Sequence, residues 1–386
     1  MDINDNLNII SRDIIPILKN TDFIKTHKLQ NLKMLDKIYF LIKKYNYKNI
    51  NNLQDYKINL NKTIITPFSL KKKNNKFISD NITKFIFNNI KKQYRVSVIL
   101  KNREINIYIS NDKIISKKKL DEIINKTISI IKVFDDLTTT QPAKLDLFIY
   151  LSSKKKQFPK NKNESLTHEH LNSGYTSYIG INNKDIVVYR EEELIKVLLH
   201  EFIHYYDFDI KTTINFMENK LFIKNCSKLY GETYTEVWAI LLNIMFIAVE
   251  KTDNYDDYLN FLQISLYINI LFLYFQGFNT LKHFNISYNM LRTEIDNIKN
   301  YKETSNGYCY NVLSSIIFAN IDLFIEMCFN NNSKSNIIDF NNDNDNNKRF
   351  ILLMLNILHS NKFKNIEKLS ENYSITNNTM RRSIIE

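Results

Sequence analysis

Glycine, proline, cysteine and tryptophan are scarce in this 386-residue chain, with five, four, three and one copies respectively. Lysine, asparagine and isoleucine are abundant instead, which indicates an AT-rich genome rather than a physical specialisation. Composition therefore says little about function. A hydrophobic fraction of 44% is enough for a buried core, and we expect a globular protein with one large or two ordinary domains.

The few cysteines exclude two kinds of site. Cys226, Cys309 and Cys328 form no paired framework and no CxxC spacing, so neither a disulfide scaffold nor a thiolate metal site is indicated. This pattern suits a reducing compartment. The first residues, MDINDNLNII, carry acids where a signal peptide needs basic residues and an apolar core. Together these features predict a cytoplasmic protein.

Long hydrophobic runs are also missing. The most apolar stretches, VWAILLNIMFIAV and FLQISLYINILFLYF, have 13 and 15 residues, whereas a membrane span needs about 20. We expect both to be buried helices and predict no membrane span.

The net charge of +12 would suit an anionic partner such as nucleic acid. Most basic residues, however, are lysines spread along the whole chain, with short runs at 71–73, 117–119 and 154–156. This distribution is typical of an ordinary solvated surface and does not indicate a dedicated nucleic-acid interface.

The hydrophobic periodicity predicts an α+β fold. An amphipathic helix is expected over residues 29–45, and residues 96–110 read as a β-hairpin around KNRE. A helix over 118–137 and three strands at 144–151, 175–181 and 185–190 follow, and the next helix contains HEFIH. This order predicts a twisted sheet backed by a helix.

After residue 210 the pattern becomes helical, with helices expected at 230–249, 256–276, 283–299, 308–329 and 349–358. We predict five parts: a mostly helical N-terminal region of unknown role (1–92), a β-sheet subdomain ending in the HEFIH helix (93–210), a helical subdomain (211–330), an Asn-rich linker (331–347), and a C-terminal helix and tail (348–386). The oligomeric state is not indicated.

The HEFIH pentapeptide has the spacing of a zinc site. His200 and His204 are four residues apart, so on a helix both imidazoles project from one face and can bind a single Zn²⁺. Glu201 follows the first histidine, where its carboxylate can take a proton from water and return it to a leaving amine.

The same five residues also occur by chance in chains of this length, but their surroundings favour a metal site. They lie in an apolar helix directly after strand-type segments, and burying two histidines and a glutamate there needs compensation. Glu191, Glu192 and Glu193 are expected in the first turn of this helix, where they complement its dipole.

A zinc peptidase needs a third protein ligand, and Glu232 and Glu236 are the candidates. Two carboxylates four residues apart share a helix face and repel each other unless a cation compensates them. We assign Glu232 as the third ligand and Glu236 as the acceptor that orients a ligand imidazole. Exchanged roles, or a solvated glutamate pair, are the alternatives.

HExxH with a glutamate ligand on a later helix resembles the gluzincin branch of zinc metallopeptidases, over roughly residues 140–250. The longer pattern also resembles metallopeptidases inferred in large DNA viruses, which implies a host-cytoplasmic or virion location. No further histidine follows at metzincin spacing. The resemblance implies a zincin-like fold, one Zn²⁺ per chain, and hydrolysis of a protein or peptide substrate.

In zincins, the strand before the motif helix binds the substrate backbone at the sheet edge. The resemblance therefore implies that Asn172, Ser173 and Gly174, at the start of one predicted strand, bind substrate, and glycine allows close approach of a ligand. An ordinary turn is the alternative.

Gluzincins also place a donor near the oxyanion. Among 23 tyrosines we choose Tyr308 and Tyr310 first and Tyr230 second. Asp207, three residues after His204, is a candidate for orienting a ligand.

Two rival interpretations remain at this point. The chain could be a zincin-fold protein that has lost turnover and serves as a binding or structural component, for example of a virion. Alternatively, it could be a basic nucleic-acid-binding protein with a coincidental HExxH. The retained Glu201 favours hydrolysis.

Overall fold

The computed structural model describes residues 23, 29–48, 57–60, 64–71, 75, 77–90, 92–101, 103–139, 144–179, 183–371 and 379–384. It has mixed α and β structure with one six-stranded open sheet, so the predicted α+β class is confirmed. Contacts divide the chain into two compact units. We call 39–156 with 172–207 the sheet unit, and 1–38, 157–171 and 208–386 the helical unit.

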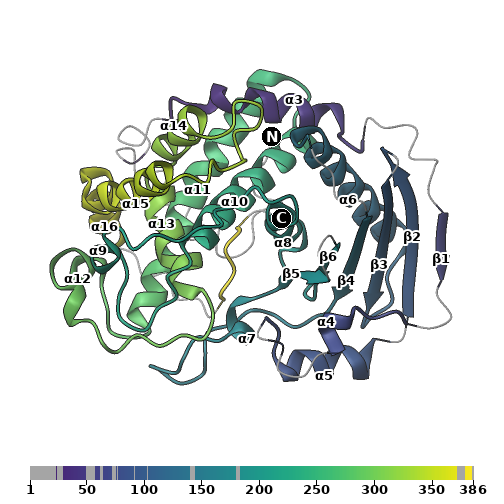
Figure 1. The fold of residues 1–386 in the computed structure, drawn as a ribbon, viewed down its shortest axis with the longest axis horizontal. Coiled ribbons are helices and arrows are strands. Elements are labelled where there is room, and N and C mark those ends of the chain that lie inside the picture. The colour runs from purple at the N-terminus through teal and green to yellow at the C-terminus, as the bar shows by residue number, and fades with distance from the viewer. Residues whose placement is uncertain are drawn as a thin grey trace. The chain divides into compact units, whose positions relative to one another are not determined.

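The sheet has the strand order β1-β2-β3-β4-β6-β5 (Figure 1). The strands are β1 (Lys57–Leu60), β2 (Lys92–Leu100), β3 (Arg103–Asn111), β4 (Lys144–Leu151), β5 (Gly174–Ile179) and β6 (Asn183–Val188). β3 pairs with β4 in parallel and β4 with β6 in parallel, while the remaining pairs are antiparallel. The predicted hairpin is β2–β3, and the three predicted strands are β4, β5 and β6.

Helices cover both faces of this sheet, which explains why its central strands are apolar at successive positions. On one face, Tyr108, Phe148 and Val187 share a buried cluster with Ile82 and Ile86 of α5 (Asp80–Asn89). On the other face lie α6 (Lys117–Leu137) and α8 (Leu194–Tyr205), and α8 contacts β5 and β6. The sheet therefore forms the middle layer of its unit.

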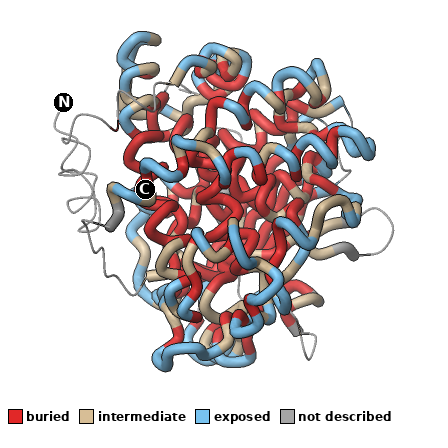
Figure 2. The backbone as a smooth tube through the Cα atoms, turned by 90° about the vertical axis from the view of Figure 1, so that its left-hand side faces the viewer, coloured by how far each residue is buried: buried red, intermediate tan, exposed pale blue. Residues whose placement is uncertain are grey.

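The helical unit is built around long helices that pack side by side (Figure 1). Its main helices are α10 (Tyr230–Lys251), α11 (Tyr255–Lys282), α12 (Tyr288–Thr293), α14 (Ile321–Asn331), α15 (Asn344–His359) and α16 (Asn361–Glu371). Figure 2 shows continuous buried stretches of backbone, with exposed residues at the outer turns. The predicted helices at 230–249, 256–276 and 349–358 are confirmed and extend slightly further.

Two other predicted helices differ from the structure. The helix expected at 283–299 is replaced by α12 and a short 3₁₀ turn at Ile295–Asn297. The helix expected at 308–329 is a π-helix (Tyr308–Leu313) followed by α13 (Ser314–Phe318) and α14, with a bend of 95° before α14. Asn320, with φ −142°, is not helical and accounts for this break.

The expectation that the apolar stretches are too short for a membrane span was wrong. α10 and α11 have 22 and 28 residues, and both are long and apolar enough to cross a membrane. A helix that is apolar on all sides belongs either to a protein core or to a bilayer. In the folded chain, 89% of the most apolar window of α10 and 72% of that of α11 are buried.

The segment predicted as a linker, 331–347, consists mainly of turns between α14 and α15. Ile338 and Phe340 are buried, and the Ile338 carbonyl accepts a hydrogen bond from Tyr234 of α10 at 2.7 Å. At the N-terminus, the helix expected at 29–45 is a 3₁₀ turn (Leu32–Leu35) continued by α3 (Asp36–Lys44).

A buried carboxyl in the sheet generates a pH prediction. Burial, and then the neighbouring charge of Asp146 on β4, raise the pKa of Asp185 on β6 to about 7. Between about pH 4 and pH 7 the folded state therefore holds a proton that the unfolded state has lost, so stability falls as the pH rises through this window. Asp185→Asn should raise the melting temperature at pH 8 and change it little at pH 4.

Thermal unfolding of Asp185→Asn against Asp253→Asn, an exposed control, measures this effect. Equal changes in both variants, or a larger gain for Asp185→Asn at pH 4 than at pH 8, would contradict the assignment.

Candidate functional site

The HEFIH helix, α8, begins three residues later than expected. Glu191 and Glu192 precede it, and Glu193 is its N-cap with a left-handed φ of 58°. The glutamates therefore do not form its first turn. Instead, the fully buried side chains of Lys156 and Glu193 form an ion pair, and the Lys156 backbone N–H donates to Glu192 at 2.8 Å. These contacts determine how the chain enters α8.

The other end of α8 is held by Lys184 of β6. Its ammonium group donates to the carbonyl of Tyr205 at 3.0 Å, where a cation also complements the negative end of the helix dipole. Lys184 further pairs with the Asp207 carboxylate at 2.7 Å. Asp207 was expected to orient a ligand histidine. It lies beyond the end of α8 instead, and its carboxylate forms an ion pair with Lys184.

His200 and His204 project from the same face of α8, and their Nε2 atoms lie 3.2 Å apart. His200 is buried and His204 is half-buried. Two imidazole nitrogens that each bind zinc at 2.0–2.1 Å with a tetrahedral angle are about 3.3 Å apart. The histidine pair therefore fits a single zinc ion at this position.

Glu201 points to the sheet and is only 5% exposed. Thr176 of β5 donates its hydroxyl hydrogen to Glu201, with Oγ1 3.0 Å from Oε2 and 3.1 Å from the backbone carbonyl. A Cβ atom added to Gly174 would lie 3.1 Å from Glu201 Oε1 and 2.9 Å from a methyl group of Val197. The glycine thus gives the carboxylate its room beside β5.

Asn172 and Ser173 precede β5, and their backbone carbonyls accept hydrogen bonds from other residues of the sheet unit. The Asn172 carbonyl accepts from Arg190 Nε at 3.1 Å, and the Ser173 carbonyl accepts the Tyr189 N–H at 2.8 Å. Of the three predicted substrate-binding residues, Gly174 is the one that lies against Glu201. β5 itself is the last strand in the sheet order.

In the helical unit, Glu232 lies in the first turn of α10 and is half-buried. Tyr310 donates its hydroxyl hydrogen to Glu232 Oε2 at 3.0 Å. The structure therefore brings together one predicted tyrosine and the predicted third ligand.

Glu236, one turn later on α10, is fully buried and has a different partner. Arg382 Nε lies 3.5 Å from its Oε1 atom. The same guanidinium stacks on the Tyr310 ring at 4.3 Å and donates to the Leu171 carbonyl at 2.6 Å. The inference that the glutamate pair requires a metal cation is thereby weakened, because the chain itself supplies a cation for Glu236.

The two other candidate tyrosines are buried, and their hydroxyl groups donate hydrogen bonds to backbone carbonyls. Tyr308 donates to the Leu221 carbonyl at 2.8 Å, and burial raises its pKa well above the ordinary value. Tyr230 donates to the Thr212 carbonyl at 3.2 Å. Tyr310 is thus the tyrosine whose hydroxyl contacts a candidate ligand.

A π-helix carries Tyr310, and such segments frequently occur at functional sites. Its first backbone N–H, that of Tyr308, donates to Glu303 at 2.8 Å. Burial raises the pKa of Glu303 to about 7 despite the hydrogen bonds that it accepts from Ser227 and Tyr301. Glu303 therefore anchors the start of the segment that positions Tyr310.

Sequence reasoning missed Thr176, Lys184, Lys156 and Arg382. Thr176 lies in the strand predicted to bind substrate, and its alternation with Gly174 could have placed it on the same face. Lys156 and Arg382 carry no local signal, since each pairs with a glutamate far away in the sequence.

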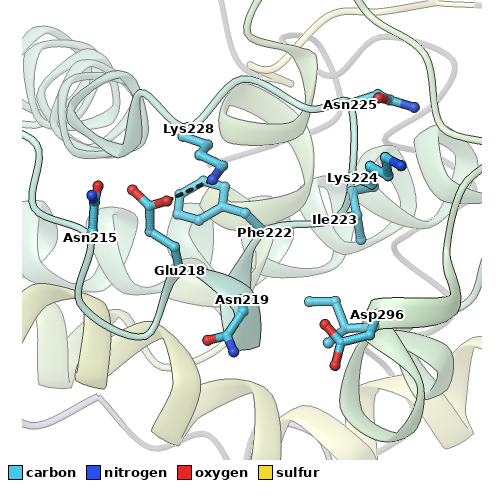
Figure 3. Close-up of a pocket in the computed structure, with 10 residues that line it drawn as sticks. Asn215, Glu218, Asn219, Phe222, Ile223, Lys224, Asn225, Lys228 and Asp296 are labelled. Atoms are coloured by element: carbon cyan, nitrogen blue, oxygen red, sulfur yellow. Dashed lines mark hydrogen bonds and ion pairs between the residues drawn. The ribbon is translucent and has the colours of Figure 1, made fainter.

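A separate pocket of about 500 Å³ lies in the helical unit, between the segment around α9 (Glu218–Leu221) and Asp296 (Figure 3). Glu218 and Lys228 form an ion pair of 2.7 Å in it, and amide side chains occupy much of the remaining lining. None of the predicted site residues lines this pocket.

Comparison of the chain with protein-family models, curated proteins and solved structures finds no match in any of the three. The proposed function therefore rests on the fold and on the geometry of the side chains.

The Glu236–Arg382 pair generates a stability prediction. Arg382→Met leaves a buried carboxylate without its guanidinium, which should lower the free energy of unfolding by about 3 kcal/mol or more. Adding Glu236→Gln should recover part of this loss, because the uncompensated charge is then removed.

Chemical denaturation of the single and double variants, with the exposed Arg349→Met as control, measures the coupling. Equal losses in Arg382→Met and Arg349→Met, or strict additivity in the double variant, would show that Glu236 does not depend on Arg382.

Proposed function

We propose that the protein is a zinc-dependent metallopeptidase of gluzincin type, with a zincin-like active site. The observation that carries this proposal is the Nε2–Nε2 distance of 3.2 Å between His200 and His204, on the helix that also holds Glu201 against β5. Zinc sites of this class combine two histidines one helical turn apart with an adjacent glutamate.

His200, His204 and Glu232 are the proposed protein ligands. Glu232 is favoured over Glu236 because it is half-buried and receives a hydrogen bond from Tyr310, whereas Glu236 is fully buried beside Arg382. A carboxylate that is already paired with a guanidinium is a poorer ligand. When bound, a zinc ion would supply Lewis-acid polarisation of water and of the scissile carbonyl.

Glu201 is the proposed general base and acid. Its carboxylate takes a proton from the attacking water as the new C–O bond forms, and returns it to the amine nitrogen as the C–N bond breaks. The Thr176 hydroxyl bonds Oε2 at 3.0 Å and so orients the carboxylate without bringing a second charge near it. Thr176 is thus a positioning residue in this mechanism.

Two further features support peptide hydrolysis. β5 lies at the end of the sheet order, where an extended peptide can pair with its backbone, as strand-adding ligands do. Tyr310 supplies a hydroxyl next to the proposed ligand Glu232, and its single O–H hydrogen can turn from Glu232 to a tetrahedral oxyanion when substrate reacts. The proposed substrate is therefore a protein or peptide bound in extended conformation.

Metal analysis combined with peptide hydrolysis tests the proposal. The purified chain should bind about one zinc per molecule. His200→Ala should abolish this binding, and Glu232→Gln should weaken it by more than about 100-fold, because loss of a ligand costs more than loss of an outer hydrogen-bond partner. Glu201→Gln should keep zinc and lower the hydrolysis of a peptide library by about 10²–10⁴-fold.

Glu294→Gln, an exposed glutamate in the helical unit, is the matched control and should behave like the wild type. If His200→Ala leaves the zinc content unchanged, the metal site is disproved. If zinc binds but Glu201→Gln and the wild type are equally inactive, the protein is a zincin-type binding protein instead.

A further inference from the structure

A second pocket of the helical unit, of about 610 Å³, has an unusual charge balance. α12, α15 and α16 supply its lining, which includes four basic side chains, Arg292, His359, Lys364 and Lys368, and one carboxylate, Glu367. A pocket with this composition attracts anions.

The one carboxylate is already neutralised. Arg292 Nη2 lies 2.6 Å from Glu367 Oε2, in an ion pair whose side chains are 9% and 20% exposed. Lys364 and Lys368 are exposed and lie one helical turn apart on α16, so they share one face and repel each other. The pocket therefore keeps a surplus of positive charge.

Arg292 provides a second, independent observation. Its side chain is more than nine-tenths buried, and its buried Nη1 atom has no hydrogen-bond partner among the residues that the structure describes. An unsatisfied buried donor is costly, and in native structures it usually has a ligand or a water as partner. The free N–H groups of a guanidinium suit phosphate or carboxylate oxygens.

The residue that α15 contributes to the pocket responds to the same positive charges. His359, at the end of α15, has a pKa below its usual value because of burial first, and then because of the charges of Arg292 and Lys364. These cationic groups from α12 and α16 therefore act on one small volume.

We propose that this pocket binds a phosphate-bearing anion. A dianion can neutralise both lysines beside the buried Arg292 guanidinium, whereas a single carboxylate carries too little charge. The volume exceeds that of inorganic phosphate, so the ligand class is a phosphorylated small molecule or a phosphate headgroup. This inference does not depend on the proposed peptidase activity, because none of the candidate zinc or catalytic residues lines the pocket.

Calorimetric titration of the full chain with inorganic phosphate and with pyrophosphate tests the proposal. Both should bind saturably, with pyrophosphate the tighter. Lys364→Ala/Lys368→Ala should weaken binding by about tenfold or more. Both lysines are exposed, so the double variant should fold. Lys220→Ala/Lys334→Ala removes the same charge elsewhere on the surface and should weaken binding by less than about twofold.

Two readouts besides affinity sharpen the test. Bound phosphate should raise the pKa of His359, followed by NMR, because a neighbouring anion stabilises the imidazolium. Sedimentation with phosphatidic acid vesicles, with and without inorganic phosphate as competitor, distinguishes a lipid headgroup from a soluble phosphate ester. No saturable binding of phosphate, pyrophosphate or vesicles, or equal weakening in the two double variants, would overturn the proposal.

Discussion

The separation of the two imidazole nitrogens on α8 is the constraint on which the account depends. The 3.2 Å between His200 and His204 requires a straight helical turn held firmly in place. Lys156 and Glu193 fix the start of this helix, and Lys184 holds the carbonyls at its end. Displacing one member of a buried ion pair is costly, because the other charge is then left uncompensated in an apolar interior. The buried ion pair at the start of α8 and the lysine hydrogen bond at its end therefore hold the histidines in register.

Much of the fold followed from local patterns. Period-2 and period-3.6 hydrophobicity placed the hairpin, β4, α6 and α8, since these elements bury their side chains within short stretches of sequence. Helices were predicted at 230–249 and 256–276, but the membrane-span expectation was wrong because it counted the apolar run rather than the whole of α10 or α11. Glu232 and Lys251 lie within α10 at its polar ends. The break at Asn320 depends on backbone geometry that no periodicity signals.

The candidate site was predictable only in its local part. His200, Glu201 and His204 follow from spacing along one helix, whereas the partners of Glu201 and Glu236 come from elsewhere in the chain. Thr176 and Arg382 meet these glutamates through tertiary packing. This packing also gives the two glutamates of α10 different environments. Glu236 belongs to a buried ion pair, while Glu232 keeps partial exposure and a tyrosine partner.

X-ray absorption at the zinc edge of the zinc-loaded full chain tests the central claim most directly. A zinc ion held by His200 and His204 should show two imidazole nitrogens and oxygen ligands at about 2.0–2.1 Å, with no sulfur in the coordination sphere. If the His204→Ala variant still binds zinc, its spectrum should show one imidazole nitrogen fewer than the spectrum of the wild type. Sulfur ligands, or a spectrum that is unchanged in His204→Ala, would contradict a zinc site built on the α8 histidines.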